Sequence, residues 1–192
     1  MKIICTICMR GGSKGVPNKN LRYLQGKPLM AYTINQALQS KLFEHVVVST
    51  DSKEIAEMAK SLGAEECFIR PPELATDEIS KLPVIRHAFL EAEKYYNQRF
   101  DVIFDLDVTS PLRSVEDIIR AFQQFTQEDA ENLITACPSR RNPYFNMVEK
   151  INGRVKIVKE LEIPPTCRQK APLVFDMNAS IYIWKRHIIL KS

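Results

Sequence analysis

Near its N-terminus the chain reads Ile3-Ile-Cys-Thr-Ile-Cys-Met-Arg-Gly-Gly-Ser-Lys-Gly-Val-Pro-Asn-Lys-Asn-Leu21. The apolar run at residues 3–9 predicts a buried β-strand, because it is short and leads at once toward glycines. A loop rich in glycine, lysine and arginine follows this strand. Ligands of open α/β sheets bind beyond the carboxyl ends of the strands, where this loop would lie. The stretch therefore predicts an α/β fold with a ligand site behind its first strand.

Apolar runs and helical patterns alternate along the rest of the chain. The β-branched run Val46-Val47-Val48 is typical of a strand buried on both faces of a parallel sheet. Further strands are predicted at residues 102–107, 133–137 and 174–184. Helices are predicted at residues 28–38, 52–62, 79–97 and 114–125. This order predicts a Rossmann-like, mostly parallel sheet with helices on both faces and right-handed crossovers.

The length of 192 residues suits one globular domain, and the sequence contains no repeat or linker that would divide it. The α/β rhythm is interrupted at about residues 140–172. There Asn152-Gly153 separates two short stretches of mixed polarity, which is the pattern of a tight β-hairpin. A hairpin leaving a parallel sheet serves as an oligomer contact, as a lid, or as a plain extension of the sheet edge. The sequence leaves these alternatives open.

Composition argues against several classes of protein. Hydrophobic residues make up 45% of the chain, and no apolar run nears the roughly 20 residues that span a bilayer. The five cysteines are an odd number without an export signal, which predicts reduced thiols and a cytoplasmic location. Cys5 and Cys8 would point to opposite faces of a strand, which argues against a shared metal or disulfide. The net charge of +4 is spread along the chain, so neither nucleic acid nor a membrane is an expected partner.

One dense cluster of positive charge lies in and after the glycine-rich loop. Its members are Arg10, Lys14, Lys19, Arg22 and Lys27. Glycine lets backbone amides approach phosphate oxygens, and the cations supply the charge that a triphosphate needs. The loop matches neither the P-loop pattern nor the glycine pattern of dinucleotide-binding folds. The alternative is a glycine-rich turn with solvated lysines, which would not require cations to converge behind the first strand.

The segment from Arg10 to Leu21 closely resembles the N-terminal signature of the acylneuraminate cytidylyltransferases, also called CMP-sialic acid synthetases. Segments 48–51, 70–77, 109–113, 136–138 and 178–183 resemble later motifs of that family, in the same order. The resemblance covers nearly the whole chain. It implies a fold of the nucleotide-diphospho-sugar transferase type. It also implies transfer of CMP from CTP to the anomeric hydroxyl of an acidic keto-sugar, with release of pyrophosphate.

The resemblance implies roles for individual residues on the nucleotide side. Arg10 and Lys19 are expected to bind the triphosphate and to act in catalysis, because in-line transfer needs positioning and neutralisation of negative charge. The remaining residues expected to bind CTP are Gly11, Gly12, Ser13, Lys14, Asn20, Asp77 and Ser80. Asp77 and Ser80 fall in the loop that reads the cytosine in the family, or else they cap the helix that follows.

On the sugar side, the resemblance points to Arg168, Gln169 and Asn178. An arginine can hold a sugar carboxylate through a bidentate pair, although Arg168 can also be a surface residue of a hairpin loop. Asp107 stands where the sialic acid enzymes have glutamine, at a position that faces the substrate. A carboxylate there would join a Mg²⁺ site, bind a differently substituted sugar, or cap loop amides. The departure brings the pattern closer to the branch that handles legionaminic acid and related bacterial diamino sugars.

A second departure concerns the metal. The family places a pair of aspartates for its metal near the C-terminus, and the sequence ends at Ser192 before any such pair. We therefore expect either a truncated protein or a Mg²⁺ site made from Asp107 and the phosphates of CTP. A homodimer is expected from the insertion and the resemblance. The alternatives to transfer onto a nonulosonic acid are a CMP-KDO-type synthetase and a catalytically inactive nucleotide-binding or assembly homologue.

Overall fold

The computed structural model describes residues 1–191, with the side chains of all of these except Glu66 and Cys67. The chain divides into two compact units. The first, here called the core unit, comprises residues 1–135 and those from 179 onward. The second, here called the hairpin unit, comprises Ala136–Asn178 and includes the insertion expected at about 140–172.

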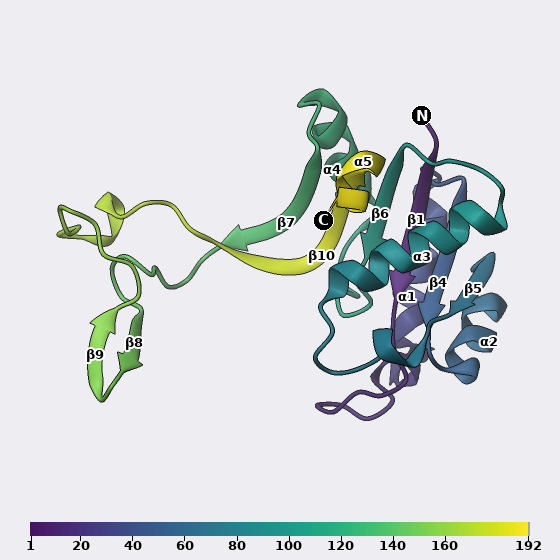
Figure 1. The fold of residues 1–192 in the computed structure, drawn as a ribbon, viewed down its shortest axis with the longest axis horizontal. Helices are drawn as coiled ribbons and strands as arrows, with labels where there is room; N and C mark the ends of the chain where they lie inside the picture. The colour runs from purple at the N-terminus through teal and green to yellow at the C-terminus, as the bar shows by residue number, and fades with distance from the viewer. Residues whose placement is uncertain (192) are drawn as a thin grey trace. The chain divides into compact units, whose positions relative to one another are not determined.

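A six-stranded sheet in the order β5-β4-β1-β6-β10-β7 organises the core unit (Figure 1). Its strands are β1 (Ile3–Cys8), β4 (His45–Thr50), β5 (Glu66–Ile69), β6 (Val102–Leu106), β7 (Asn132–Pro138) and β10 (Phe175–Lys185). The strand β1 pairs in parallel with both β4 and β6, and β4 pairs in parallel with β5. The strand β10 runs antiparallel to β6. The predicted mostly parallel sheet is thereby confirmed.

Helices cover both faces of this sheet, as the sequence pattern predicts. They are α1 (Leu29–Ser40), α2 (Lys53–Ser61), α3 (Lys81–Tyr95), α4 (Val115–Gln127) and α5 (Arg186–Lys191). On one face, Ile34 of α1, Ile55 of α2 and Ile118 of α4 belong to one buried cluster. On the other face, Phe89 of α3 and Ile189 of α5 belong to a second cluster. Alternate residues of β1 enter the two clusters, which fixes the strand between two helix layers.

Local signals explain where the helices begin. At the start of α4, the Ser114 side chain accepts from the Asp117 amide while the Asp117 carboxylate accepts from the Ser114 amide, so the predicted capping box is present. The helix predicted at 79–97 begins at Lys81, with Ser80 at the N-cap position. The Ser80 side chain makes no capping hydrogen bond.

Several short elements complete the chain. Strands β2 (Tyr23–Leu24) and β3 (Lys27–Pro28) pair with each other, and 3-10 turns lie at η1 (Lys19–Leu21), η2 (Pro72–Leu74) and η3 (Arg168–Lys170). The sequence analysis did not find β5, because its four residues are too few for a periodic signal. No helix within residues 1–191 has both the length and the apolar character needed to cross a bilayer.

The hairpin unit contains β8 (Val148–Ile151) and β9 (Arg154–Ile157), which pair antiparallel. Asn152 and Gly153 join them with φ angles of 50° and 79°, both in the left-handed region. Two left-handed residues at the tip are what a tight hairpin turn requires, so the Asn-Gly prediction is confirmed. Cys137 and Cys167 of this unit are free thiols, as are Cys5 and Cys8 of the core unit. The side chain of Cys67 lies outside the described residues.

Candidate active site

The glycine-rich loop leaves the carboxyl end of β1 and is fixed against the end of β4. The Gly11 amide donates a hydrogen bond to Asp51 Oδ1 at 2.8 Å, directly after β4. A Cβ atom at position 11 would lie 3.1 Å from the Cβ of Ser52. A side chain at Gly11 would therefore push the loop away from the sheet. At Gly12, in contrast, a Cβ would meet nothing within 4 Å, so this residue lies on the open side of the loop.

Asn20 fixes the same loop through its side chain. Its side chain is buried, and its Nδ2 donates to the backbone oxygen of Arg10 at 2.9 Å. The sequence analysis expected Asn20 to bind the phosphate or ribose, and that role stays a prediction. The contact observed here shapes the loop that carries Arg10. Lys19, one residue earlier, is half-buried and has no ion pair among the described residues.

Two cations of the loop converge on one carboxylate. Arg10 Nη1 lies 2.5 Å from Asp77 Oδ1, and Lys14 Nζ lies 2.5 Å from Asp77 Oδ2. Hydrogen bonds from Lys14 and then Arg10 hold the pKa of the Asp77 carboxyl below its usual value. The loop thus already binds an anionic group, presented by the segment between η2 and α3. The cytosine contact expected of Asp77 stays a prediction.

A buried arginine that the sequence analysis did not single out binds the backbone just before the loop. Arg70 directly follows β5, and its Nη2 donates to the backbone oxygens of Met9 at 3.1 Å and Ser49 at 2.6 Å. It therefore ties together the carboxyl ends of β1 and β4. Segment 70–77, which resembles a motif of the family, contains this residue, but nothing in its sequence indicates that the side chain would be buried.

A second charge cluster lies at the carboxyl end of β6. Lys81 Nζ lies 2.7 Å from Asp105 Oδ2 and 2.8 Å from Asp107 Oδ2. Asp105 is fully buried, and its Oδ1 accepts from Thr6 of β1 at 3.1 Å. Lys81 Nζ also lies 4.8 Å above the ring of Tyr182 on β10. Burial lowers the pKa of the Lys81 amine, but the two carboxylates outweigh burial and raise it above its ordinary value.

Asp107 is bound on both of its carboxylate oxygens. Its Oδ1 accepts from the amide and the hydroxyl of Thr109, at 2.8 and 2.6 Å, and its Oδ2 accepts from Lys81. Burial raises the pKa of the Asp107 carboxyl, whereas the Lys81 charge and these hydrogen bonds lower it, and the net result lies below the usual value. The Thr109 contacts match the loop-capping alternative for Asp107.

Cys8 lies at the end of β1, near the same cluster. Burial first, and then the negative charge of Asp105, raise the pKa of its thiol well above the ordinary value. The thiol is therefore protonated and a poor nucleophile. Among the described side chains, no group of three or more histidine, cysteine or acidic residues is arranged to hold a metal ion.

Arg113 fixes the segment that follows β6. It is buried, and its Nη1 donates to the backbone oxygens of Asp107 at 3.2 Å and Ser180 at 2.6 Å. Its Nη2 donates to Thr33 Oγ1 and Gln36 Oε1 of α1 at 3.1 and 3.0 Å. One guanidinium therefore joins α1, β10 and the turn after Asp107. Arg113 falls in segment 109–113, which resembles a motif of the family, but the sequence analysis gave it no role.

The residues expected on the sugar side lie in the hairpin unit. Arg168 and Gln169 belong to η3, and Arg168 Nη2 donates to the backbone oxygen of Ser139 at 3.2 Å. Asn178 lies on β10 and is the last residue of that unit. Their part in sugar binding stays a prediction.

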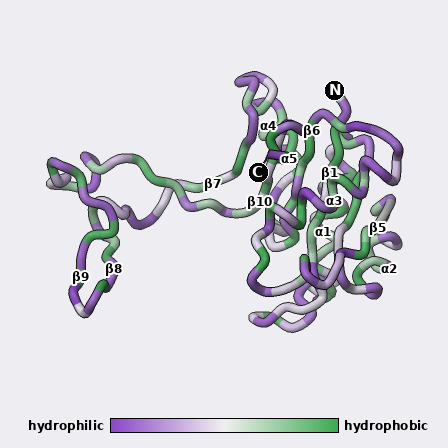
Figure 2. The backbone as a smooth tube through the Cα atoms, viewed as in Figure 1, coloured by the Kyte–Doolittle hydropathy of each residue, from purple (hydrophilic) through white to green (hydrophobic). Residues whose placement is uncertain are grey.

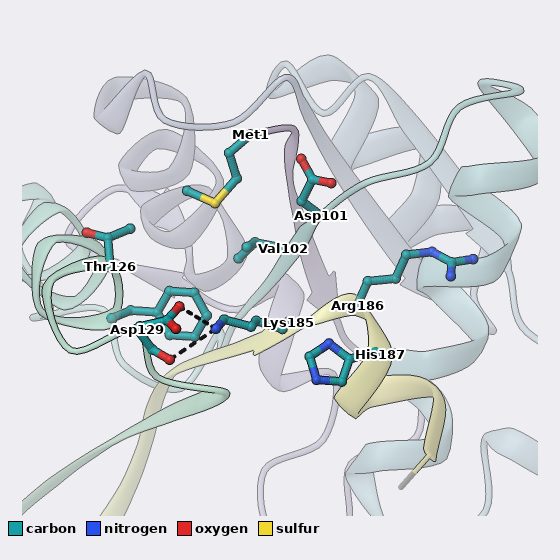
Figure 3. Close-up of a pocket in the computed structure, with 9 residues that line it drawn as sticks. Met1, Asp101, Val102, Thr126, Asp129, Lys185, Arg186 and His187 are labelled. Atoms are coloured by element: carbon teal, nitrogen blue, oxygen red, sulfur yellow. Dashed lines mark hydrogen bonds and ion pairs between the residues drawn. The ribbon is translucent and has the colours of Figure 1, made fainter.

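A cavity of about 520 Å³ lies away from these clusters, beside the amino ends of β1 and β6 (Figure 3). Met1, Asp101 and Val102 line one side of it, and Lys185 and Arg186 line another. Lys185 is paired with Asp129 across the cavity wall, at 2.5 Å. Ligands of this fold bind at the opposite ends of the strands, so the cavity lies outside the candidate site.

Comparisons with known proteins show the family and the fold of the chain. The model of the cytidylyltransferase family matches residues 4–188. The chain is 52% identical over 191 residues to the CMP-N,N'-diacetyllegionaminic acid synthase of Campylobacter jejuni, covering 100% of this chain and 80% of that protein. The same figures hold for post-translational flagellin modification protein B of Campylobacter coli.

More distant proteins match part of the sequence or share the fold. The N-acylneuraminate cytidylyltransferase of Escherichia coli is 45% identical over 124 residues, which are 65% of this chain and 28% of that protein. Among solved structures, the CMP:2-keto-3-deoxy-manno-octonic acid synthetase complexed with CTP superimposes with a TM-score of 0.73. That match covers 100% of this chain and 77% of the other at 18% identity, so it shows the fold alone.

Proposed function

This chain belongs to the cytidylyltransferase family, and we propose that it transfers CMP from CTP to the anomeric hydroxyl of a nonulosonic acid of the legionaminic type, releasing pyrophosphate. The named relatives are nucleotidyltransferases that make CMP-linked sugar acids. The legionaminic branch is supported by the 52% identity to the Campylobacter jejuni synthase. It is also supported by Asp107, which stands in place of the family's glutamine.

One observation supports the nucleotide site most directly. Arg10 and Lys14 converge on a single carboxylate, that of Asp77, although the three residues come from two separate loops. Cations that hold a carboxylate between them are positioned to hold a phosphate group in the same way. Lys19 and the amide groups of Gly12 and Ser13 lie on the same loop and would extend the site along the triphosphate.

The proposed reaction needs little covalent chemistry from the protein. The anomeric hydroxyl attacks the α-phosphorus, the bond to pyrophosphate breaks, and the hydroxyl proton passes to a base or to water. Arg10, Lys14 and Lys19 would neutralise the negative charge that moves onto the leaving pyrophosphate. The main task of the loop is to hold the triphosphate so that the hydroxyl can approach opposite the leaving group.

Mg²⁺ stays part of the proposal as a partner of the CTP phosphates, where it would add positive charge at the triphosphate. Asp107 fits it poorly as a ligand. Its Oδ2 already contacts an ammonium group, and its Oδ1 accepts two hydrogen bonds from Thr109. No step of the proposed reaction therefore depends on a metal held by Asp107.

We also propose that the hairpin unit mediates a homodimer. Large apolar side chains are exposed throughout this unit. Figure 2, which colours the backbone by residue hydropathy, shows hydrophobic stretches alternating with hydrophilic ones in the part of the chain that contains β8 and β9. Val148 and Val155 are 60% and 64% exposed, and Ile163 is 85% exposed. Such a concentration of apolar surface is typical of a protein contact.

The test is calorimetric titration of the chain with CTP, UTP, GTP and ATP, with and without Mg²⁺, followed by a pyrophosphate-release assay with sugar acids. We expect a preference for CTP and release of pyrophosphate with N,N'-diacetyllegionaminic acid. Preferred release with KDO would favour the CMP-KDO-type alternative. Binding of CTP without release with any sugar acid would favour an inactive nucleotide-binding homologue.

A further inference from the structure

The Lys81 ammonium is enclosed by groups that favour a cation. Two carboxylates contact it, from Asp105 and Asp107, and the ring of Tyr182 lies on a third side. The Tyr182 ring is itself stacked on Trp184, with the ring planes 3° apart. Asp105 and Tyr182 lie on the neighbouring strands β6 and β10, and Asp107 directly follows β6, so the position of the ammonium is set by the sheet.

The helix that carries Lys81 does not favour a cation at this place. Lys81 is the first residue of α3, and the N-terminus of a helix carries partial positive charge. A lysine there is disfavoured unless nearby anions stabilise it. Asp105 and Asp107 supply those anions, and Lys81 keeps 31% of its side chain exposed.

Counting hydrogen bonds shows what Asp107 can still bind. A carboxylate has about four acceptor positions, two on each oxygen. Thr109 uses two on Oδ1, and Lys81 uses one on Oδ2. One position on Oδ2 remains, and the side chain is 20% exposed. The free position suits a single neutral donor, such as an O–H or an amide N–H group.

The same position does not suit a divalent cation. A Mg²⁺ ion would bind about 2.1 Å from the oxygen that already lies 2.8 Å from the ammonium, and the two cations would repel each other. The only other carboxylate nearby, that of Asp105 among the described side chains, is buried and also contacts Lys81. Lys81 therefore stands where an ion bridging the two carboxylates would have to be.

The sheet order indicates which part of a substrate would meet this cluster. The phosphate-binding loop follows β1, and β1 lies between β4 and β6. The loop contacts the β4 side through Gly11 and Asp51, so the β6 side, with Asp107, remains for the group that is joined to the α-phosphate. The segment from Asp77 to Lys81 connects the two places, since Asp77 contacts the loop and Lys81 contacts β6.

We propose that Lys81 is a positioning residue that takes the place of a metal between Asp105 and Asp107 and thereby reserves the Asp107 carboxylate for one hydrogen-bond donor of the sugar acid. The part of this inference that concerns binding of the sugar acid, here called the sugar half, rests on the proposed function. The part that concerns exclusion of a metal ion, here called the metal half, does not. Lys81 thus decides between metal ligand and sugar acceptor, which are two of the three roles that the sequence leaves open for Asp107.

The first experiment measures Mn²⁺ binding by electron paramagnetic resonance, and it needs no activity. With CTP present, Asp107→Asn should bind Mn²⁺ within about twofold of the unchanged protein, because the ion is held by phosphates. A loss of tenfold or more would overturn the proposal. Without nucleotide, Lys81→Met should gain a Mn²⁺ site between the two carboxylates. The double variant Lys81→Met/Asp107→Asn, which lacks one of those carboxylates, should not gain the site. A folded Lys81→Met protein that gains no Mn²⁺ site would also overturn the proposal.

Lys81→Met leaves buried Asp105 without its counter-ion, so this variant can fail to fold. Circular dichroism shows whether Lys81→Met is folded. If it is not, Lys81→Gln, which can still donate a hydrogen bond to one carboxylate, takes its place in the Mn²⁺ measurement. The Asp107→Asn measurement is independent of both variants, because Lys81 remains paired with Asp105 there. The proposal can therefore be overturned even if no Lys81 variant folds.

The second experiment separates KM from kcat with CTP and N,N'-diacetyllegionaminic acid. Loss of one hydrogen bond to a charged group should raise the KM for the sugar acid about tenfold in Asp107→Asn, with the Kd for CTP unchanged. Lys81→Gln should show the same pattern, and Lys81→Arg, which keeps the charge, should restore most of the lost affinity. An unchanged sugar KM in Asp107→Asn would overturn the sugar half. Absence of turnover with every sugar acid would instead overturn the proposed function and leave the Mn²⁺ result intact.

Discussion

Asp77 Oδ1 lies 2.5 Å from Arg10 Nη1, so a carboxylate of the chain itself lies against the guanidinium expected to bind the triphosphate. The other oxygen of the same carboxylate contacts Lys14. Because the two cations would be needed for phosphate oxygens, an incoming triphosphate has to displace Asp77. The segment that carries Asp77 leads directly into α3, so displacement of Asp77 would also shift the chain near Lys81, the first residue of that helix.

We therefore predict that Asp77→Asn binds inorganic triphosphate more tightly. Exposed ion pairs each contribute little, so removing the two pairs should increase affinity by only several-fold. Calorimetric titration with triphosphate and with CTP measures the effect. Glu73→Gln, which changes an exposed acid of the nearby turn η2, is the matched control and should leave both affinities unchanged. Weaker binding of triphosphate by Asp77→Asn would show that the carboxylate organises the loop instead of competing with the ligand.

Arg10→Ala and Lys19→Ala should each weaken CTP binding about tenfold or more, because each removes a charge-assisted contact to phosphate. The fold should remain, since neither side chain is buried in the core. Fluorescence or calorimetric titration gives the affinity, and circular dichroism gives the fold. Lys94→Ala changes an exposed lysine of α3 and serves as the control. Wild-type CTP affinity in Lys19→Ala would remove Lys19 from the nucleotide site.

Arg113→Met should destabilise the protein by about 2–4 kcal/mol, because it leaves several buried acceptors without a donor. Those acceptors include the Asp107 and Ser180 backbone oxygens. Urea denaturation measures the free energy of unfolding. The exposed Arg99→Met is the control and should change it by no more than about 0.5 kcal/mol. An equal effect of the two substitutions would mean that the buried network contributes little.

Acid should destabilise the protein through carboxyl groups whose folded pKa is lowered. Asp117 is one of them, chiefly because the Ser114 amide and side chain hydrogen-bond to it, and Asp107 is another. A lowered folded pKa contributes stability above the unfolded pKa of about 4, and this stability is lost as the pH falls through the folded value. Urea midpoints should therefore be flat from pH 7 to about pH 5 and fall below it.

Asp117→Asn tests this account directly. It should lower stability at pH 7 by about 0.5–2 kcal/mol, as loss of a helix cap does, and it should flatten the decline below pH 5. The control is Glu116→Gln. Glu116 lies one residue away on the same turn and has no capping contact among the described side chains. If the variant and the unchanged protein decline in parallel, the acid sensitivity comes from other groups.

Val155→Glu should weaken the proposed dimer, because it places a charge within the exposed apolar surface of the hairpin unit. Light scattering at micromolar concentration should show a dimer for the unchanged chain and a lower average mass for the variant. Lys156→Glu alters the neighbouring exposed position without removing an apolar group and is the control. A monomeric mass for the unchanged chain would contradict the dimer itself.

Patterns that are local in the sequence were sufficient for much of the fold. The apolar runs of β1, β4 and β6, the capping box at Ser114 and the Asn152-Gly153 turn lie where the sequence predicts them. The glycine-rich loop also follows β1 as expected. Each of these signals depends on residues within a few positions of one another, so backbone sterics and the period of buried side chains determine them.

The ion pairs of the site join residues that are far apart in the chain. The sequence indicated a cation-rich loop and a carboxylate at position 107, but it gave no reason to pair Asp77 with Arg10, or Lys81 with Asp105 and Asp107. Arg70 and Arg113 likewise gave no sign that they would be buried.

By itself, then, the sequence determined an α/β fold with a glycine- and cation-rich loop behind β1, and it predicted that this loop binds phosphate. Only the tertiary structure decided which charges neutralise one another across that edge of the sheet. The physical reason is that an ion pair needs two groups within about 4 Å, and for groups 26 or 67 residues apart that distance is set by strand order and helix packing.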